Sequence, residues 1–326
     1  MRSSLQRRAP TLLRTISRRS QYEAAIISNA PRPAAAATRP AAVAPQKRWH
    51  SSVNADEISH FNALASTWWD PHGSSRALHL MNPLRHDFIN TCRSTSLSSS
   101  TTVTPEPNSQ PTAGQQQQHQ APKLRYLDVG CGGGIFAESA ARLPSTHSVT
   151  AIDAAPVIIQ VARQHASKDP LLAEPTKLRY INTTIENLAS TLQSSPEGSK
   201  FDVVTLFEVI EHVDQPANFL SHLSNHVKPG GWLVLSTIAR TWTSWFTTNF
   251  MAEDVLGIVP KGTHDWNKYI NDDELRGYFS KFADEQGWDL SSLMVQGVVY
   301  VPGLGWKEVQ GSEKVGNYFL GVQKKA

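Results

Sequence analysis

A glycine-rich turn at residues 130–134 is the first feature of this sequence with a chemical consequence. The apolar run Leu124–Val129 precedes it, and Asp128 stands two residues before Gly130. Glycines at positions 130, 132, 133 and 134 remove the side chains that would keep a ligand away from the backbone. A strand that ends in such a turn typically lays a flat adenosine-type cofactor against bare peptide groups. We therefore expect a cofactor site at this turn.

Two kinds of cofactor compete for the turn: a nicotinamide or flavin dinucleotide, and S-adenosylmethionine. The dinucleotide pattern G-x-G-x-x-G does not match from Gly130, because position 135 is isoleucine. From Gly132, only the looser form that ends in alanine matches. Asp153, at the end of the next apolar run, suits the ribose hydroxyls of either cofactor. Asp128 favours S-adenosylmethionine, because methyltransferases use an acid before the first glycine to orient the turn.

Two acids and a histidine follow the apolar run Phe201–Phe207. Glu208, Glu211 and His212 are spaced i, i+3 and i+4, so a helical backbone would place all three on one face. Two carboxylates and an imidazole can hold a divalent cation and leave positions for water or substrate. The structural alternative is a helix cap, a solvent-facing acid and a histidine that packs or accepts a proton. The spacing favours the metal site.

Alternating strand and helix patterns surround these groups. Alternation of this kind predicts an α/β fold, in which a mostly parallel sheet is covered by helices on both faces. Ligands of such sheets bind at the carboxyl ends of the strands, which would bring Gly130, Asp153 and Phe207 to one crevice. The predicted strands are 124–129, 148–152, 177–182, 201–207, 231–237, 288–300 and 317–323, and the predicted helices are 55–69, 78–92, 134–143, 156–167, 185–192, 214–227, 242–256 and 272–284.

Composition divides the chain into four parts. Residues 1–50 carry ten basic residues against a single acid, Glu23, and are rich in Ser and Ala, which indicates a mitochondrial transit peptide rather than a basic tail. Residues 51–93 hold the first two predicted helices. Residues 94–122 are Ser, Thr, Pro and Gln with almost no apolar content, so we predict a disordered insert. Residues 123–326 form the α/β domain.

The bulk composition excludes several functions. The net charge of +3 comes from the first 50 residues, and the remainder is mildly acidic, so the sequence does not indicate nucleic-acid binding. Two cysteines, Cys92 and Cys131, cannot form a disulfide framework, and we expect Cys131 to fill space in the turn. No apolar run reaches the roughly 18 residues that a membrane-spanning helix needs.

Several motifs together resemble the ubiquinone biosynthesis O-methyltransferases, which are class I methyltransferases that use S-adenosylmethionine. LDVGCGGG and VKPGGW occur in many methyltransferases, whereas FNALASTWWD, MNPLR and VPKGTHDWNKYI are much narrower. The resemblance covers roughly residues 55–93 and 123–326. It implies a Rossmann-like fold with a mostly parallel seven-stranded sheet, helices on both faces and an N-terminal helical extension.

The resemblance also assigns roles to individual residues. Arg85 would pair with the methionine carboxylate through a charge-assisted contact, and Asp153 would bind the ribose hydroxyls. Gly130 would let the backbone approach the cofactor, and Phe207 would lie beside it. In eukaryotic members the Glu, Glu and His of the second motif bind magnesium. The implied cofactor-binding residues are thus Arg85, Gly130, Asp153 and Phe207, and the implied ligands of Mg²⁺ or another divalent cation are Glu208, Glu211 and His212.

The implied reaction methylates a hydroxyl of polyprenylated dihydroxybenzoate and demethylubiquinol intermediates. A phenol has a pKa of about 10, so its oxygen is a poor nucleophile at neutral pH. A divalent cation can lower that pKa, or a histidine can take the proton. His212 cannot readily be both a metal ligand and the base, so His264 is a second catalytic candidate.

Residues 240–266 are rich in large apolar side chains and follow the fifth predicted strand. They form either a lid helix on the core or an interfacial helix that dips into the bilayer, where a polyprenyl tail resides. The resemblance implies a peripheral protein on the matrix side of the mitochondrial inner membrane. Its implied partners are the polyprenylated substrate, the membrane surface and other subunits of a coenzyme Q biosynthetic complex, with no nucleic acid.

Three other functions are compatible with parts of this pattern. The chain could methylate another small phenol, act as a dinucleotide oxidoreductase, or serve as a non-catalytic lipid-binding subunit of the biosynthetic complex. Intact Arg85, Asp153, Glu208 and Glu211 argue against the last of these.

Overall fold

The computed structural model describes residues 55–73, 75–100, 122–192, 196–241 and 266–326. The predicted transit peptide at 1–50, most of the predicted insert at 94–122, His264 and nearly all of the apolar segment 240–266 lie outside the described residues. Within the described part, no helix has the length and apolar character needed to cross a membrane.

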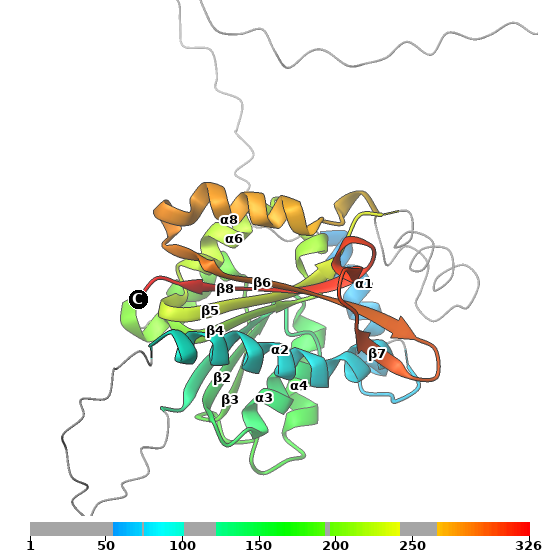
Figure 1. Ribbon diagram of the computed structural model, residues 1–326. Coiled ribbons are helices and arrows are strands. Elements are labelled where there is room, and N and C mark those ends of the chain that lie inside the picture. Colours follow the sequence, from blue (N-terminus) through cyan, green and yellow to red (C-terminus); the bar gives the residue numbers. More distant parts are fainter. Residues whose placement is uncertain (1–54, 74, 101–121, 193–195, 242–265) are drawn as a thin grey trace, which may run out of the picture. The chain divides into compact units, whose positions relative to one another are not determined.

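A sheet of eight strands forms the centre of the described fold (Figure 1). Its order is β3-β2-β1-β4-β5-β8-β6-β7. The first five strands in this order pair in parallel, whereas β8 runs antiparallel to both of its neighbours, as does β7 to β6. The predicted mostly parallel sheet is thus confirmed. The strands are β1 (Leu124–Val129), β2 (Thr146–Asp153), β3 (Leu178–Asn182), β4 (Phe201–Phe207), β5 (Val227–Ile238), β6 (Trp288–Val301), β7 (Gly305–Glu308) and β8 (Asn317–Lys324).

Strand β7 makes eight strands where seven were expected. It pairs with the end of β6, from Val298 opposite Glu308 to Val301 opposite Gly305. Its four residues are too few to show a hydrophobic alternation, so the sequence does not distinguish them from a turn. The Nε1 of Trp306 donates a hydrogen bond at 2.9 Å to the carbonyl of Ala77 in the first turn of the helix Arg76–Ser100, which ties the hairpin to that helix.

Helices cover both faces of the sheet, as predicted (Figure 1). Strand alternation explains the two layers, because successive side chains point to opposite faces. In β4, Val204 and Leu206 pack into one buried cluster, and Val203 and Phe207 into the other. The first cluster is covered by α5 (Ile185–Leu192), α6 (Pro216–Ser224) and α8 (Asp272–Gln286), and the second by α2 (Arg76–Ser100), α3 (Ile135–Arg142) and α4 (Pro156–Ala166).

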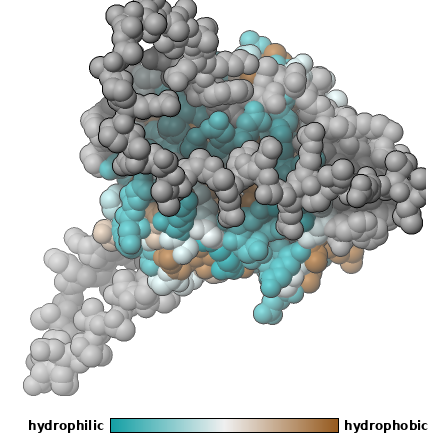
Figure 2. All heavy atoms as spheres, turned by 90° about the horizontal axis from the view of Figure 1, so that it is seen from above, coloured by the Kyte–Doolittle hydropathy of each residue, from teal (hydrophilic) through white to brown (hydrophobic). Residues whose placement is uncertain are grey.

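The N-terminal helical extension packs on the beginnings of α3 and α4. It consists of α1 (Ala55–Leu64), the short turn η1 (Ala65–Thr67) and the two residues that follow, Trp68 and Trp69. Ala65 and Trp68 form a third buried cluster with Ile135, Ala155 and Ile158. Seen from the side of α8, the described surface of the molecule is mostly hydrophilic, with separate hydrophobic areas (Figure 2). Ala65 and Trp68 are themselves buried in the third cluster.

Helix α2 continues to Ser100, so the predicted insert at 94–122 begins too early. The hydroxyls of Ser94 and Thr95 both donate hydrogen bonds to the Thr91 carbonyl, at 2.9 and 3.0 Å. Such local bonds let polar side chains stay on a helix that their composition does not favour. The predicted start of the insert was set by composition alone, whereas the end of the helix is set by its hydrogen bonds.

Candidate functional site

The glycine turn lies at the carboxyl end of β1, beside the end of β2. The backbone N–H groups of Gly130 and Cys131 both donate to the Ile152 carbonyl, at 2.8 and 3.0 Å. Gly130, Gly132 and Gly134 have φ values of 69°, 52° and 94°. A residue with a Cβ is strained in this left-handed region, so the turn needs glycine for its backbone shape. The predicted tight turn is confirmed.

Two tryptophans of the N-terminal extension close over the turn. A Cβ on Gly133 would lie 2.2 Å from Trp68 Cδ1, and one on Gly132 would lie 2.3 Å from Trp68 Cζ2. The Nε1 of Trp69 donates to the Gly133 carbonyl at 2.9 Å, and its ring stacks on His165 with centroids 3.5 Å apart. The bare glycines thus accommodate an indole ring as well. From the sequence, both tryptophans are placed only within the predicted helix 55–69 and the motif FNALASTWWD.

Asp153 holds the turn in place. Its Oδ2 accepts a hydrogen bond from Gly132 N at 3.0 Å, and its Oδ1 accepts one from Ala155 N at 2.8 Å. Burial raises the pKa of this carboxyl, and the backbone hydrogen bonds oppose the rise. We expected Asp128 to orient the turn, but Asp153 does so. Asp128 instead accepts a hydrogen bond from Thr205 Oγ1 at 2.7 Å.

Four buried polar atoms around the turn have no hydrogen-bond partner among the described residues. They are Trp68 Nε1, Arg85 Nε, Asp128 Oδ2 and the hydroxyl of Tyr180, which lies against Gly134. An unpartnered buried donor or acceptor costs about 1–3 kcal/mol, so native proteins rarely leave one without reason. A cation, a neutral donor and a carboxylate oxygen are the partners that the carboxylate and amine of an amino acid require. This set fits the methionine end of S-adenosylmethionine.

Arg85 projects from α2 and is only 4% exposed. Its guanidinium carbon lies 4.8 Å from the ring centroid of Phe207, the last residue of β4. Burial lowers the pKa of Arg85, while the charges of Glu208, Asp128 and Glu211 act in the opposite direction. Within the described part of the chain, Arg85 forms no ion pair. Its charge is therefore available to an anionic ligand.

Glu208 follows β4 directly, with a φ of 55°. Its backbone N–H donates to the Ser236 carbonyl at 3.1 Å. Ser236 Oγ donates to Glu208 Oε1 at 2.7 Å, and Asn317 Nδ2 donates to Oε2 at 3.4 Å. The predicted continuous helical face is wrong, because Glu208 is still held by β5. The helical part is the single 3₁₀ turn η3 (Ile210–His212).

Glu211 is buried, with 4% exposure. Its Oε2 accepts a hydrogen bond from Thr237 Oγ1 at 2.9 Å. Burial raises the pKa of Glu211 to about 7, and the negative charge of Glu208 contributes to the rise. The two carboxyl groups therefore lie near enough for the charge of Glu208 to act on Glu211 despite the missing helix. A divalent cation between such groups would relieve their repulsion.

His212 is engaged by a residue that sequence reasoning missed. Its Nδ1 lies 3.0 Å from Oε2 of Glu57 on α1, 155 residues earlier in the chain. Burial disfavours the imidazolium, but the hydrogen bond to Glu57 and the nearby carboxylates outweigh it and raise the pKa of His212. In the sequence, Glu57 is an acid shortly before the motif FNALASTWWD. Acids are common in the first turn of a helix, so nothing marks Glu57 as a partner of His212.

The three predicted metal ligands meet only in part. No set of three His, Cys, Asp or Glu side chains is arranged to hold a metal ion in the part of the chain that the structure describes. Two neighbouring carboxylates, Glu208 and Glu211, have the donor chemistry that Mg²⁺ prefers. His212, in contrast, turns its Nδ1 to Glu57. The three-ligand magnesium site stays a prediction.

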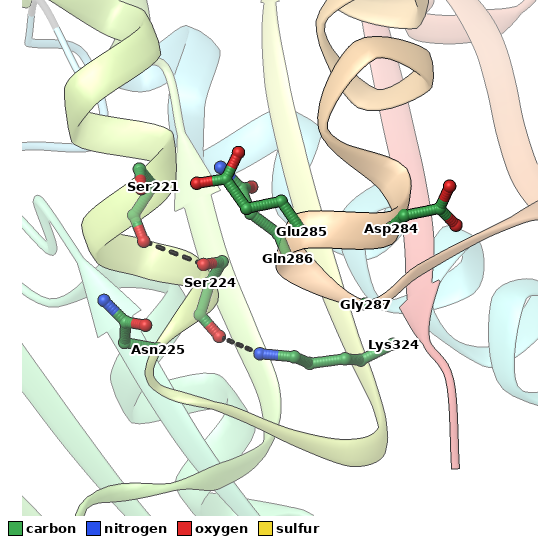
Figure 3. A pocket seen from close by; sticks show the side chains of 8 residues that line it. All are labelled: Ser221, Ser224, Asn225, Asp284, Glu285, Gln286, Gly287 and Lys324. Carbon is green, nitrogen blue, oxygen red and sulfur yellow. Dashed lines mark hydrogen bonds between the residues drawn. The ribbon is translucent and has the colours of Figure 1, made fainter.

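A polar hollow of about 360 Å³ lies at the opposite end of the strands from the turn (Figure 3). It is formed at the ends of α6, α8 and β8, where Lys324 Nζ donates to the Ser224 carbonyl. Ser224 ends α6 just before β5 begins, whereas the glycine turn follows the end of β1. The hollow is therefore remote from the turn, and its polar lining offers no surface for an apolar acceptor.

Comparisons with known proteins find similarity to methyltransferases. The family described as "Methyltransferase domain" matches residues 103–283. The mitochondrial ubiquinone biosynthesis O-methyltransferase of Schizosaccharomyces pombe is 44% identical over 284 residues, which cover 86% of this chain and 89% of that protein. The corresponding protein of Candida albicans is 40% identical over 292 residues, covering 84% and 86%. The ubiquinone biosynthesis O-methyltransferase of the bacterium Cereibacter sphaeroides is 39% identical over 229 residues, covering 69% and 80%.

Among solved structures, magnesium protoporphyrin IX methyltransferase from Synechocystis PCC 6803 with bound SAM is similar with a TM-score of 0.48 and 13% identity. The match covers 84% of this chain and 100% of that one. A SAM-dependent methyltransferase from Thermotoga maritima matches with a TM-score of 0.47 and 15% identity, covering 83% and 100%.

Proposed function

The chain belongs to the ubiquinone biosynthesis O-methyltransferase family, and on that premise we propose that it methylates a hydroxyl of polyprenylated dihydroxybenzoate and demethylubiquinol intermediates. One observation carries the proposal. The adjacent parallel strands β1 and β4 end side by side, β1 in the glycine turn with its unpartnered polar atoms and β4 in Glu208. A donor site and an acceptor site at neighbouring strand ends are what a group-transfer enzyme requires.

The donor side of the proposal uses residues whose charge or shape fits S-adenosylmethionine. Bound there, this cofactor supplies an electrophilic methyl group on its sulfonium. Arg85 would bind the methionine carboxylate, and Asp128 Oδ2 would accept a hydrogen bond from the amine. Each carboxylate oxygen of Asp153 accepts one hydrogen bond from a backbone N–H group. Each oxygen retains a second lone pair for a ribose hydroxyl.

The acceptor side must activate a phenol whose ordinary pKa is about 10. His212 would accept the hydroxyl proton at Nε2, so that the oxygen attacks as the phenolate. With His212 as the base, Glu208 and Glu211 alone of the three implied ligands would hold Mg²⁺ or another divalent cation, which would lower the pKa of the acceptor hydroxyl. Ser236, Thr237 and Asn317 orient the two carboxylates through the hydrogen bonds described above.

We also propose a location. The relatives from three fungi are named mitochondrial, and residues 1–50 have the composition of a transit peptide. A polyprenyl tail keeps the acceptor in a bilayer, so we propose peripheral association with the matrix side of the inner membrane. Other subunits of a coenzyme Q biosynthetic complex are the proposed protein partners.

Transfer of a labelled methyl group from S-adenosylmethionine to a short-tailed demethylubiquinol tests the function. We expect labelled quinol with Mg²⁺ present and a large loss of product in a chelator. A tail-free catechol serves as the matched acceptor. Faster labelling of the catechol than of the quinol would indicate an enzyme for another small phenol, and labelling of neither, despite cofactor binding, would indicate a non-catalytic subunit.

A further inference from the structure

The contact between Glu57 and His212 joins two segments that the sequence keeps far apart. Glu57 lies in the first turn of α1, and His212 ends the 3₁₀ turn η3 after β4. The Nδ1 to Oε2 distance is 3.0 Å, and the two side chains are 16% and 23% exposed. The bond is thus partly shielded from water, which strengthens a hydrogen bond relative to an exposed one.

Neighbouring groups hold both members of this pair. Lys268 Nζ lies 3.5 Å from the other carboxylate oxygen of Glu57 and 3.4 Å from Asp214 Oδ1. The Phe61 ring meets the His212 ring edge to face, with centroids 5.1 Å apart and an interplanar angle of 83°. Rotation of either side chain would break one of these contacts. The imidazole is therefore held in one orientation.

The partner of Nδ1 decides which ring nitrogen can react. A carboxylate only accepts hydrogen bonds, so the Nδ1 of His212 must donate to Glu57. In a neutral imidazole the proton on Nδ1 leaves the lone pair on Nε2. Nε2 makes no hydrogen bond with the described residues. It is thus the nitrogen left for the reaction.

Attachment of α1 to the core does not depend on this bond. The extension is anchored by Ala65 and Trp68, which pack against Ile135 and Ile158 in a separate buried cluster. Trp69 adds its hydrogen bond to the Gly133 carbonyl. Removing the Glu57 carboxylate should therefore leave the extension docked. A purely structural role would predict the opposite.

We propose that Glu57 is a positioning residue for the methyl transfer: it fixes the ring and the tautomer of His212, so that Nε2 meets the acceptor hydroxyl. The inference rests on the proposed function for the identity of the acceptor. It extends that function by making the N-terminal helix α1 part of the acceptor site. In other proteins, removing the carboxylate behind a metal-binding histidine changes metal affinity or activity roughly 10- to 100-fold, and we expect an effect of that order for the carboxylate behind His212.

The test compares Glu57→Gln and Glu57→Ala with the control Asp214→Asn. Asp214 contacts Lys268 as Glu57 does, but it does not contact His212. We expect kcat to fall roughly 10- to 100-fold in both Glu57 variants, with the KM for S-adenosylmethionine within twofold of wild type. Asp214→Asn should change kcat less than twofold. Thermal unfolding of all three should follow wild type closely.

Nitrogen NMR of protein labelled at histidine gives a readout independent of turnover. The His212 signals are assigned from their loss in His212→Asn. We expect the Nδ1–H tautomer in wild type and in Asp214→Asn, and a mixture or the Nε2–H tautomer in the Glu57 variants. An unchanged tautomer or an unchanged kcat in Glu57→Gln would overturn the proposal. Equal losses of kcat and cofactor binding would overturn it in favour of a structural role.

The two proposals fail in different ways. If wild type methylates no quinol but the tautomer responds to Glu57, the positioning role stands and the proposed acceptor is wrong. If wild type methylates the quinol and Glu57→Gln does so equally fast, the acceptor is right and the positioning role is wrong.

Discussion

The two sides of the site are built by different means. The turn side, which comprises residues 130–134 with Asp153 and Arg85, is mainly a matter of shape: glycines in left-handed conformations, closely covered by indole rings. The carboxylate side, which comprises Glu57, Glu208, Glu211 and His212, is a matter of charge. Its side chains come from distant segments, and the carboxylates among them raise the pKa of His212. Shape should therefore decide donor binding, and charge should decide turnover.

The largest effect should come from a side chain at Gly130. Gly130 and Gly230 have φ values of 69° and 72°, but an added Cβ would lie 2.4 Å from Val209 Cγ2 at Gly130 and would meet nothing within 4 Å at Gly230. Alanine at Gly230 should cost about 1–2 kcal/mol in left-handed strain. Alanine at Gly130 should cost a further 1–3 kcal/mol or so from overpacking, and should weaken donor binding.

Urea unfolding of the two variants, with S-adenosylhomocysteine titrated into each, checks this prediction. Equal losses of unfolding free energy in Gly130→Ala and Gly230→Ala would mean that close packing does not shape the turn side.

Arg85→Met should weaken S-adenosylhomocysteine binding by about 2–4 kcal/mol, because the ligand carboxylate would lose a buried cation. Stability should not fall, since methionine fills similar space and removes a buried charge that lacks an ion pair among the described residues. Arg179, exposed on β3, gives the matched control Arg179→Met. Calorimetric titration that finds equal affinities for both variants would remove Arg85 from the donor site.

Asp128→Asn should flatten the pH dependence of stability. Burial raises the pKa of Asp128 from 3.8 to about 7, so between these values the folded state holds a proton that the unfolded state has lost. Stability therefore falls as pH rises through that window. The variant lacks this titration, and its unfolding free energy should decline by about 1–3 kcal/mol less between pH 4 and pH 8 or so.

Urea unfolding at several pH values, with the cofactor absent, measures that difference. Thr205 can still donate to the remaining side-chain oxygen of asparagine. Parallel curves for wild type and variant would show that Asp128 does not titrate in this range.

The turn side could be predicted from the sequence because its information is local. Gly130 directly follows its strand, and Asp153 ends the next strand. Their positions in the sequence therefore place both at the carboxyl ends of neighbouring strands. The role of Asp128 was misassigned because two acids, Asp128 and Asp153, lie near the same turn. Which of them reaches Gly132 N depends on the pairing of β1 with β2. Strand pairing is a tertiary property that spacing does not encode.

The carboxylate side could be predicted only in its residue types. The i, i+3, i+4 spacing assumed a helix, but hydrogen bonds from β5 hold Glu208 outside it. Ser236, Thr237 and Asn317, which orient the carboxylates, look like ordinary strand residues. Glu57 is 155 residues from His212 and carries no motif of its own for that contact. Side chains from distant segments that meet in the fold have no fixed spacing in the sequence, so no motif predicts their contact.

Donor binding and acceptor activation are separate tasks of the two sides of the site. The double variant Glu208→Gln, Glu211→Gln tests this claim most directly, through its affinity for S-adenosylhomocysteine measured beside its methyl transfer to a short-tailed quinol. We predict an affinity equal to or higher than that of wild type, because two negative charges near Arg85 are removed, together with a loss of turnover of at least about 100-fold. Loss of cofactor affinity in parallel with turnover, or full turnover in the double variant, would contradict the claim.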